Sequence, residues 1–240
     1  MPTDIILIVF MLMDLPYMQN SIDASIRVAI KNAVCHLRNG GVVIYPTETF
    51  FAIGCRIDCP QAIERVFQLK RRCHLTALPV LIPSSDLLST IAQTYTYDAL
   101  TLNRLCALWP APLTLLLKVN LGIPDILTAG TGKIAVRMSP HPVASILTQL
   151  CGCPIVSTSA NISGMPPVVY AADISKELLY GLCTAGDLLL DVPPQPSGGL
   201  PSTIVEPCGV MNLRLLRNGA FAPLRLERLG FNIITHKDSQ

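Results

Sequence analysis

Two spacings of apolar residues alternate along this chain of 240 residues. Apolar positions recur every three or four residues, as on one face of a helix, in the segments 21–38, 60–70, 84–92, 97–109, 141–150 and 173–180. Short runs rich in Val, Ile and Leu, which favour strands, occupy residues 42–45, 78–82, 113–119, 134–138, 154–158, 186–191, 202–206 and 213–219. Strands that alternate with helices are typical of an α/β protein built around a sheet.

Residues at the ends of these segments fit the same pattern. Ser21 is placed to cap the first helix and Gly40 to end it, and Pro60 suits the first turn of the second helix. Asp173 is expected to cap the helix that runs to Tyr180.

The Pro- and Gly-rich segment 191–202 predicts a loop within one domain, because the chain that follows it is too short for a second one. We therefore expect one catalytic domain over residues 21–221 and a C-terminal tail over 222–240. Residues 1–20 are expected to form an N-terminal extension, for which an early, mis-assigned start codon is one explanation.

Composition excludes several classes of protein. Half of the residues are apolar and 14% are charged, so the chain is not expected to be disordered. A formal net charge of +2 disfavours a protein that holds duplex nucleic acid mainly through its phosphates. The apolar run Ile5–Met13 is too short for a membrane span, which needs about 20 residues. A cytoplasmic protein without a membrane segment is expected.

The nine cysteines include two close pairs, Cys55/Cys59 and Cys151/Cys153, but no CxxC motif. No histidine stands near them at zinc-finger spacing. This pattern favours reduced, mostly buried thiols over a metal site, and no metal-ligating residue is predicted.

Polar residues gather in four places, most of them at strand ends, where α/β proteins bind ligands. These are Tyr45–Thr49, Lys70–Arg72, Arg137 and Ser157–Gly164. Three of these clusters have an ordinary explanation, such as a capped turn or a solvated helix end. Arg137 is less easily explained, because an arginine in an apolar strand must face solvent or be paired. Together the clusters predict a site for a polyanion such as a nucleoside triphosphate, without a Walker A or GxGxxG loop.

Seven stretches carry a resemblance to a known family. They are GGVVIYPTETFFAIGC (40–55), LKRR (69–72), LWPAPLTLLL (108–117), IAVRMSPHPVA (134–144), PIVSTSANISGMPP (154–167), PSTIVE (201–206) and LRLLRNGA (213–220). In this order they resemble the YrdC-like threonylcarbamoyl-AMP synthase family, over roughly residues 21–221.

The resemblance implies a twisted mixed sheet flanked by helices, with a concave, positively lined ligand cavity. It implies an enzyme that joins L-threonine, bicarbonate and ATP, the last with Mg²⁺, into threonylcarbamoyl-AMP and pyrophosphate. The product would feed the threonylcarbamoyl modification of tRNA, through downstream tRNA threonylcarbamoyl transferase proteins. Weak RNA binding is a further expectation.

The family's motifs assign roles to nine residues. The resemblance implies catalytic and ATP-binding roles for Lys70, Arg72, Ser159 and Asn161. It implies L-threonine contacts for Thr49, Arg137, Ser157 and Ser202. Arg217 is implied as a further ATP contact. The family's reaction needs positioning and charge neutralisation and no covalent nucleophile, which agrees with the residues present.

Two departures from the family pattern keep other functions open. Thr76, which cannot supply a positive charge, stands where relatives often carry a polar or basic residue, and Pro167 stands where many carry a hydroxyl near the nucleotide. One alternative is an RNA-binding module of the same fold without catalysis, although the single tryptophan, Trp109, offers little for base stacking. A carbamoyl-transfer enzyme of related fold and an inert paralogue are the others.

Overall fold

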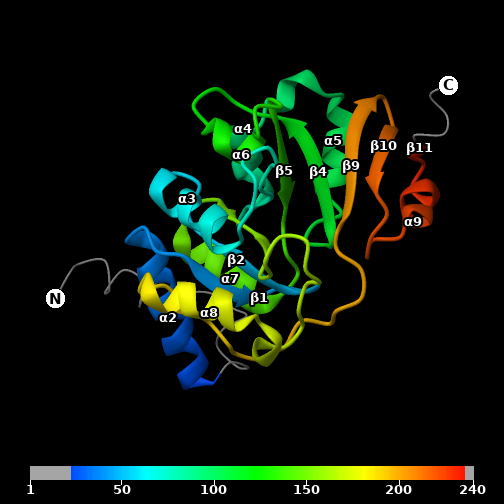
Figure 1. The fold of residues 1–240 in the computed structure, drawn as a ribbon. Coiled ribbons are helices and arrows are strands. Elements are labelled where there is room, and N and C mark those ends of the chain that lie inside the picture. The colour runs from blue at the N-terminus through cyan, green and yellow to red at the C-terminus, as the bar shows by residue number, and fades with distance from the viewer. Residues whose placement is uncertain (1–22, 236–240) are drawn as a thin grey trace.

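The computed structural model describes residues 23–235, whose strands form two mixed sheets (Figure 1). The smaller sheet has the order β7–β2–β1–β8, with bounds Thr158–Ser159, Phe51–Gly54, Val43–Pro46 and Leu188–Leu189. The larger sheet has the order β11–β10–β9–β4–β5–β3–β6, with bounds Asn232–Ile234, Asn212–Arg217, Thr203–Gly209, Leu113–Lys118, Lys133–Arg137, Val80–Leu81 and Ile155–Val156. The predicted α/β class is confirmed, with two mixed sheets in place of one.

Helices cover both faces of the smaller sheet. On one face lie α2 (Ala24–Arg38) and α7 (Pro142–Cys151), and on the other lie α3 (Pro60–Leu69) and α8 (Lys176–Thr184). Along β1, Val43 packs with α2 and α7 while Ile44 packs in the other core. This alternation explains why the strand is apolar at every position, since both of its faces are buried.

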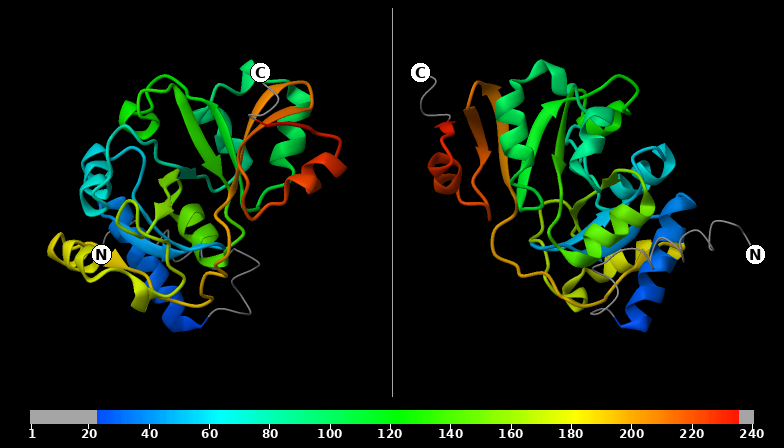
Figure 2. Two further views of the ribbon diagram at one scale, coloured as in Figure 1. Left: turned by 45° about the vertical axis from the view of Figure 1, so that its right-hand side comes forward. Right: turned by 180° about the vertical axis from the view of Figure 1, so that it is seen from behind.

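The larger sheet carries α5 (Ala99–Cys106) on its far face, as Figure 2 shows from behind. The remaining short helices are α4 (Leu88–Ile91), α6 (Asp125–Thr128), α9 (Pro223–Arg228) and the 3₁₀ turns η1 (Ser85–Leu87), η2 (Thr94–Thr96) and η3 (Ala171–Asp173). No helix within residues 23–235 is long and apolar enough to cross a membrane. The apolar run Ile5–Met13 lies outside the described residues.

One extended segment belongs to both sheets. Residues 155–156 pair with β3 in the larger sheet, and residues 158–159 pair with β2 in the smaller one. Ser157 lies at the crossing, where its backbone N–H donates to the carbonyl of Pro79 over 2.8 Å. The serine-rich stretch that follows is therefore held at the junction between the two sheets.

Most predicted segments form the expected elements, and three differences concern the helix ends and the C-terminal segment. Asp173 does not cap α8, because it ends the 3₁₀ turn η3, and the side chain of Ser175 accepts the capping bond from the N–H of Leu178 over 3.2 Å. The first helix begins at Ala24 after the cap Asp23, and Ser21 lies outside the described residues. These ends differ because a cap one or two residues away satisfies the same free N–H groups.

The third difference concerns the segment expected to be a tail. Within it, α9 packs beside β11, and β11 pairs parallel with β10 at the edge of the larger sheet. Leu226 of α9 and Phe231 are buried in the same core as α5. The described part of residues 222–240 is thus folded onto the larger sheet.

Candidate active site

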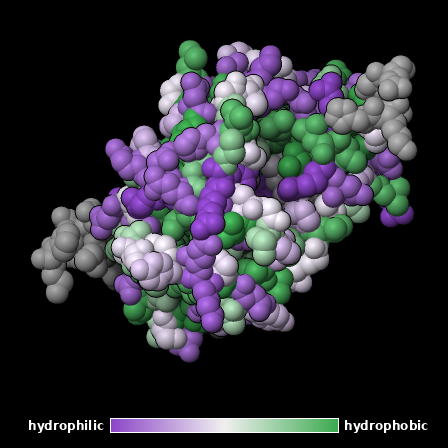
Figure 3. All heavy atoms as spheres, viewed as in Figure 1, coloured by the Kyte–Doolittle hydropathy of each residue, from purple (hydrophilic) through white to green (hydrophobic). Residues whose placement is uncertain are grey.

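A cavity of about 200 Å³ lies where the two sheets meet. Ala52 and Ser159 reach it from the smaller sheet, and Arg137 and Arg217 reach it from the larger one. Figure 3 shows the molecule from the side seen in Figure 1, with hydrophilic residues spread across the middle of that face. Seven of the nine predicted site residues line the cavity, namely Thr49, Arg72, Arg137, Ser157, Ser159, Ser202 and Arg217. Lys70 and Asn161 do not belong to the lining.

Arginine supplies all the charge in the cavity lining. Arg72 follows α3, Arg137 ends β5 and Arg217 ends β10, and no Asp or Glu is among the lining residues of the described chain. Burial lowers the pKa of Arg72 and of Arg217, and the positive charge of Arg137 adds to the effect at Arg217. The guanidinium groups stay charged because the pKa of arginine starts very high. This excess of positive charge favours an anionic ligand.

The arginines are held by hydrogen bonds from neighbouring loops. Arg217 donates from Nε to the carbonyl of Ser202 over 2.9 Å and from a terminal nitrogen to the Ser202 hydroxyl over 3.0 Å. Arg72 donates to the carbonyl of Ala77 over 2.9 Å and, at 3.4 Å, to that of Thr76. Thr76 therefore contacts Arg72 through its backbone carbonyl and not through its side chain.

Arg137 is buried and ion-paired, as expected for an arginine within an apolar strand. Its guanidinium forms an ion pair with Glu48 of the β1–β2 turn, and Arg137 as a whole is 8% exposed. The hydroxyl of Ser139 donates to the other carboxylate oxygen of Glu48 over 2.5 Å. Sequence reasoning missed Glu48, although a lone carboxylate between two threonines in a ligand-binding turn was the available clue.

Lys70 lies behind the cavity wall and is 1% exposed. Its ammonium group donates to the carbonyls of Ser159 and Asn161, and its own carbonyl accepts from the N–H of Ser163 over 2.8 Å. Burial, followed by repulsion from Arg72, lowers the pKa of Lys70 to about 7. In this conformation Lys70 holds the serine-rich turn in place from behind.

Asn161 also shapes this turn. Its side-chain amide donates to the carbonyl of Ile162 over 3.0 Å and to that of Met165 over 2.5 Å. Its carbonyl oxygen and the hydroxyl of Ser157 are buried and have no hydrogen-bond partner among the described residues. Of these two residues, Ser157 belongs to the cavity lining and Asn161 does not.

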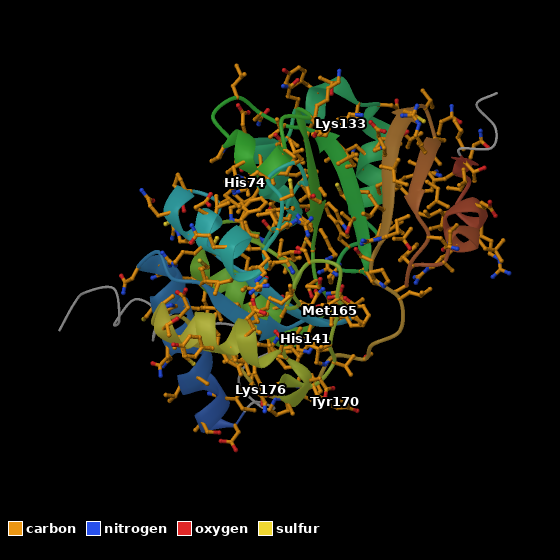
Figure 4. The ribbon with its side chains drawn as sticks, viewed as in Figure 1. His74, Lys133, His141, Met165, Tyr170 and Lys176 are labelled. Atoms are coloured by element: carbon orange, nitrogen blue, oxygen red, sulfur yellow. The ribbon has the colours of Figure 1, made fainter. Side chains whose placement is uncertain are left out.

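His141 does not line the cavity, but its backbone N–H donates to the hydroxyl of Ser139, which contacts Glu48. In Figure 4, Lys133, the first residue of β5, lies near the top of the view, and His141, which follows the other end of the strand, lies below it. The Nε2 of His141 donates to the carbonyl of Pro194 over 3.0 Å, and its Nδ1 is buried without a partner in the described chain. Burial lowers the pKa of His141. It links the loop 191–202 to the segment that carries Arg137 and Ser139.

The described residues contain no group of three or more His, Cys, Asp or Glu side chains that could hold a metal ion. All nine cysteines are free of disulfides. Cys55 and Cys151 are buried, and Cys73, Cys183 and Cys208 are exposed.

Comparison with known proteins identifies the family. The sequence model of the Sua5/YciO/YrdC family, described as "Telomere recombination", matches residues 35–219. This chain belongs to the Sua5/YciO/YrdC family.

Curated relatives in the family are named threonylcarbamoyl-AMP synthase. The protein of Photobacterium profundum is 34% identical over 149 residues, which cover 62% of this chain and 80% of the relative. That of Alkalilimnicola ehrlichii is 36% identical over 163 residues, covering 68% of this chain and 84% of the relative. The resemblance predicted from the sequence motifs is thus confirmed.

Solved structures agree with the family assignment. Sua5 of P. abyssi complexed with L-threonine matches with a TM-score of 0.76 at 29% identity, covering 86% of this chain and 58% of that one. A double variant of the same protein matches with a TM-score of 0.80 at 28% identity, covering 91% of this chain and 64% of that one. This chain thus spans about three fifths of Sua5. YciO of E. coli, with a TM-score of 0.65 at 23% identity, supports the fold alone.

Proposed function

We propose that this chain makes threonylcarbamoyl-AMP and pyrophosphate from L-threonine, bicarbonate and ATP, for the threonylcarbamoyl modification of tRNA. The observation that carries the proposal is a single cavity lined by three arginines and several hydroxyls, with no lining carboxylate in the described chain. A substrate set with a carboxylate, a bicarbonate and a triphosphate supplies the negative charge that this cavity lacks. The names of the curated relatives point to the same reaction.

The amino-acid end of the cavity is assigned to the region around Arg137. The cavity of about 200 Å³ is partly open to solvent and smaller than the roughly 300–1,000 Å³ usual for drug-sized ligands, so it would hold the amino acid while the nucleotide extends out of its open side. The guanidinium of Arg137 would bind the substrate carboxylate, with the hydroxyls of Thr49, Ser157 and Ser202 near the rest of the amino acid. The L-threonine bound in P. abyssi Sua5 supports this choice of ligand.

The reaction would proceed by positioning and charge stabilisation. The amine of L-threonine takes up bicarbonate-derived carbon dioxide as a carbamate. A carbamate oxygen then attacks the α-phosphorus of ATP in line, and pyrophosphate leaves. Arg72 and Arg217 are placed to stabilise the charge that gathers on the phosphates. ATP would enter as its Mg²⁺ complex, in which phosphate oxygens and water hold the ion.

Lys70 and Asn161 contribute from behind the wall in this scheme. Lys70 fixes the carbonyls of Ser159 and Asn161, so the hydroxyl of Ser159 and the backbone of the turn stay aimed at the nucleotide. Its ammonium charge adds to the positive potential of the cavity without occupying it. Serine and asparagine suit this turn because compact side chains leave room for two ligands side by side.

The experiment is a pyrophosphate-release assay with the full chain, MgATP and each combination of L-threonine and bicarbonate. We expect release only when L-threonine and bicarbonate are both present, together with a product of the mass of threonylcarbamoyl-AMP. RNA binding without pyrophosphate release would instead support the binding module, and release that depends on carbamoyl phosphate would support the carbamoyl-transfer enzyme. Either result, or none at all with folded protein, rejects the proposal.

A further inference from the structure

Two cysteines meet at the turn between α7 and β6. Gly152 ends α7 in the left-handed conformation, with φ of 73°, and its N–H donates to the carbonyl of Thr148 over 3.1 Å. This reversal brings the Sγ atoms of Cys151 and Cys153 to 3.6 Å from each other. Neither cysteine lines the cavity, and α7 separates the pair from His141 at the start of the helix. The pair has no role in the proposed function.

The environment of the pair favours a thiolate. Arg56 lies near the cysteine pair, because Arg56 forms an antiparallel β-bridge with Ile155. Arg38 also lies nearby and donates to the carbonyl of Leu150 over 2.7 Å. The S–H of Cys153, followed by the charges of Arg56 and Arg38, lowers the pKa of Cys151, while burial and the carboxylate of Asp58, which is paired with Arg56 over 2.6 Å, act in the opposite direction. Thiolates, not thiols, are the nucleophiles in cysteine oxidation.

Two other cysteines, Cys55 and Cys106, lack this environment. Burial raises the pKa of Cys106 to about 11, and it raises that of Cys55 as well. Cys55 belongs to the other close pair in the sequence, but burial has the largest effect on its pKa. Cys106 is half-buried, as Cys153 is, and therefore offers a matched control for exposure.

We propose that Cys151 and Cys153 form an oxidisable dithiol, a modification site that takes a small peroxide and closes to an intramolecular disulfide. The Cys151 thiolate attacks one oxygen of hydrogen peroxide, which gives a sulfenic acid and releases hydroxide. The Cys153 thiol then attacks the sulfenic sulfur, the S–S bond forms, and the hydroxyl leaves as water with the thiol proton. A dithiol reductant reverses the reaction by exchange.

The geometry permits closure without unfolding. A disulfide needs its sulfur atoms about 2.0 Å apart, so the two sulfurs must approach from 3.6 Å. Rotation of the two side chains at a glycine turn supplies such a movement, and the half-buried Cys153 gives a small oxidant a path to the pair.

The test uses the full, reduced chain treated with graded hydrogen peroxide, blocked with a maleimide and digested with trypsin. No lysine or arginine lies between Arg137 and Lys176, so Cys151 and Cys153 fall in one peptide, 138–176, that holds no other cysteine. We expect this peptide to lose both maleimide groups and two hydrogen atoms at a peroxide dose that leaves Cys106 fully blocked. Treatment with dithiothreitol before blocking should restore both maleimide groups.

Cys153→Ser provides the second measurement, with Cys106→Ser as the matched control. In Cys153→Ser the sulfenic acid on Cys151 has no thiol to resolve it, so dimedone should label peptide 138–176. Cys106→Ser should close the disulfide as the unmodified chain does. The proposal is overturned if both thiols keep their maleimide at a dose that oxidises the exposed Cys208. Irreversible oxidation of the pair, or disulfides between chains through it, overturns it equally.

Discussion

At the scale of single residues, the site depends on how each charge is held. Arg137 faces the cavity but is tied from behind by Glu48, which the hydroxyl of Ser139 also contacts. A guanidinium that is fixed before the ligand arrives loses less side-chain entropy on binding. Glu48 therefore acts as a positioning residue for the group that would bind the substrate carboxylate.

Glu48→Gln tests this role. The substitution keeps the shape of the side chain but removes the ion pair, so Arg137 is expected to turn more freely. We expect the KM for L-threonine to rise about tenfold, which corresponds to about 1.4 kcal/mol, with a smaller change in kcat. Steady-state pyrophosphate release measures both constants.

Glu177→Gln is the matched control, because Glu177 pairs with Arg71 over 2.5 Å where both side chains are more than half exposed. It should leave both constants unchanged, since exposed ion pairs contribute little. Equal kinetics for Glu48→Gln and Glu177→Gln would show that the Glu48 pair does not position Arg137.

Lys70 predicts a pH dependence of anion binding. Its pKa of about 7 is lowered by burial and by Arg72, and an anion beside Arg72 would raise it again. The bound state then holds more protons than the free state between the two pKa values, so proton uptake accompanies binding. Affinity for pyrophosphate should therefore fall as the pH rises above 7, as titration calorimetry in buffers of different ionisation enthalpy would show.

Lys70→Met should remove the proton uptake and lower turnover by a factor that corresponds to about 3 kcal/mol, the usual effect of losing one preorganised donor. Arg71→Met is its neighbour and control, because Arg71 points to Glu177 and not to the serine-rich turn. Uptake that persists in Lys70→Met would assign the titration to another group.

At the scale of elements, the sequence predicted the segments better than the way they join. Strong apolar runs such as 113–119 and helices such as α7, with Pro142 in its first turn, follow from local spacing. The strand β2 was not expected, since residues 46–54 contain no alternation and owe their pairing to β1 and β7. Lys70 was assigned to the cavity by its motif, but a motif does not specify which way a long side chain points.

The contacts of Asp187 also escaped prediction, because its partners are distant in sequence. Its buried carboxylate accepts from the N–H of Val42 over 2.7 Å, from His36 over 3.0 Å and from Arg65 over 3.2 Å. These bonds join α2, β1 and α3 around the strand that leads to Thr49. Asp187 is thus a central support of the smaller sheet.

Asp187→Asn is expected to lower the free energy of unfolding by about 3 kcal/mol, because it leaves Arg65 and His36 without their carboxylate. Chemical denaturation followed by circular dichroism measures the effect. Asp191→Asn alters an exposed carboxylate, bonded to Gln195 over 3.1 Å, and should change stability by much less. Equal stability of the two variants would contradict a supporting role for Asp187.

At the scale of the whole molecule, the cavity lies at the junction of two sheets that share one hydrophobic core, while a second core packs α2 and α7 against the other face of the smaller sheet. Residues 155–159 cross from one sheet to the other, and the loop 191–202 returns from the smaller sheet to β9, with Gly198 donating to the carbonyl of Thr49 over 2.8 Å. A ligand that contacts both sheets would add to the packing and hydrogen bonds that already join them. Ligand binding should therefore stabilise the whole fold.

Thermal unfolding with ligands checks this expectation. At a concentration one hundred times the Kd, a ligand adds about 2.7 kcal/mol to the free energy of unfolding. We expect L-threonine and MgATP each to raise the Tm, and the two together to raise it further. Glycine, which has the carboxylate but not the side chain, is the control and should raise it less. Equal shifts with L-threonine and glycine would argue against a fitted amino-acid pocket.

The most direct measurement is a crystal structure of this chain with L-threonine and a non-hydrolysable ATP analogue. The account predicts the threonine carboxylate within hydrogen-bond distance of Arg137 and the triphosphate against Arg72, both in the one cavity between the sheets. An amino acid bound elsewhere on the chain, or a triphosphate that avoids this cavity while Arg72, Arg137 and Arg217 keep their present contacts, would contradict it.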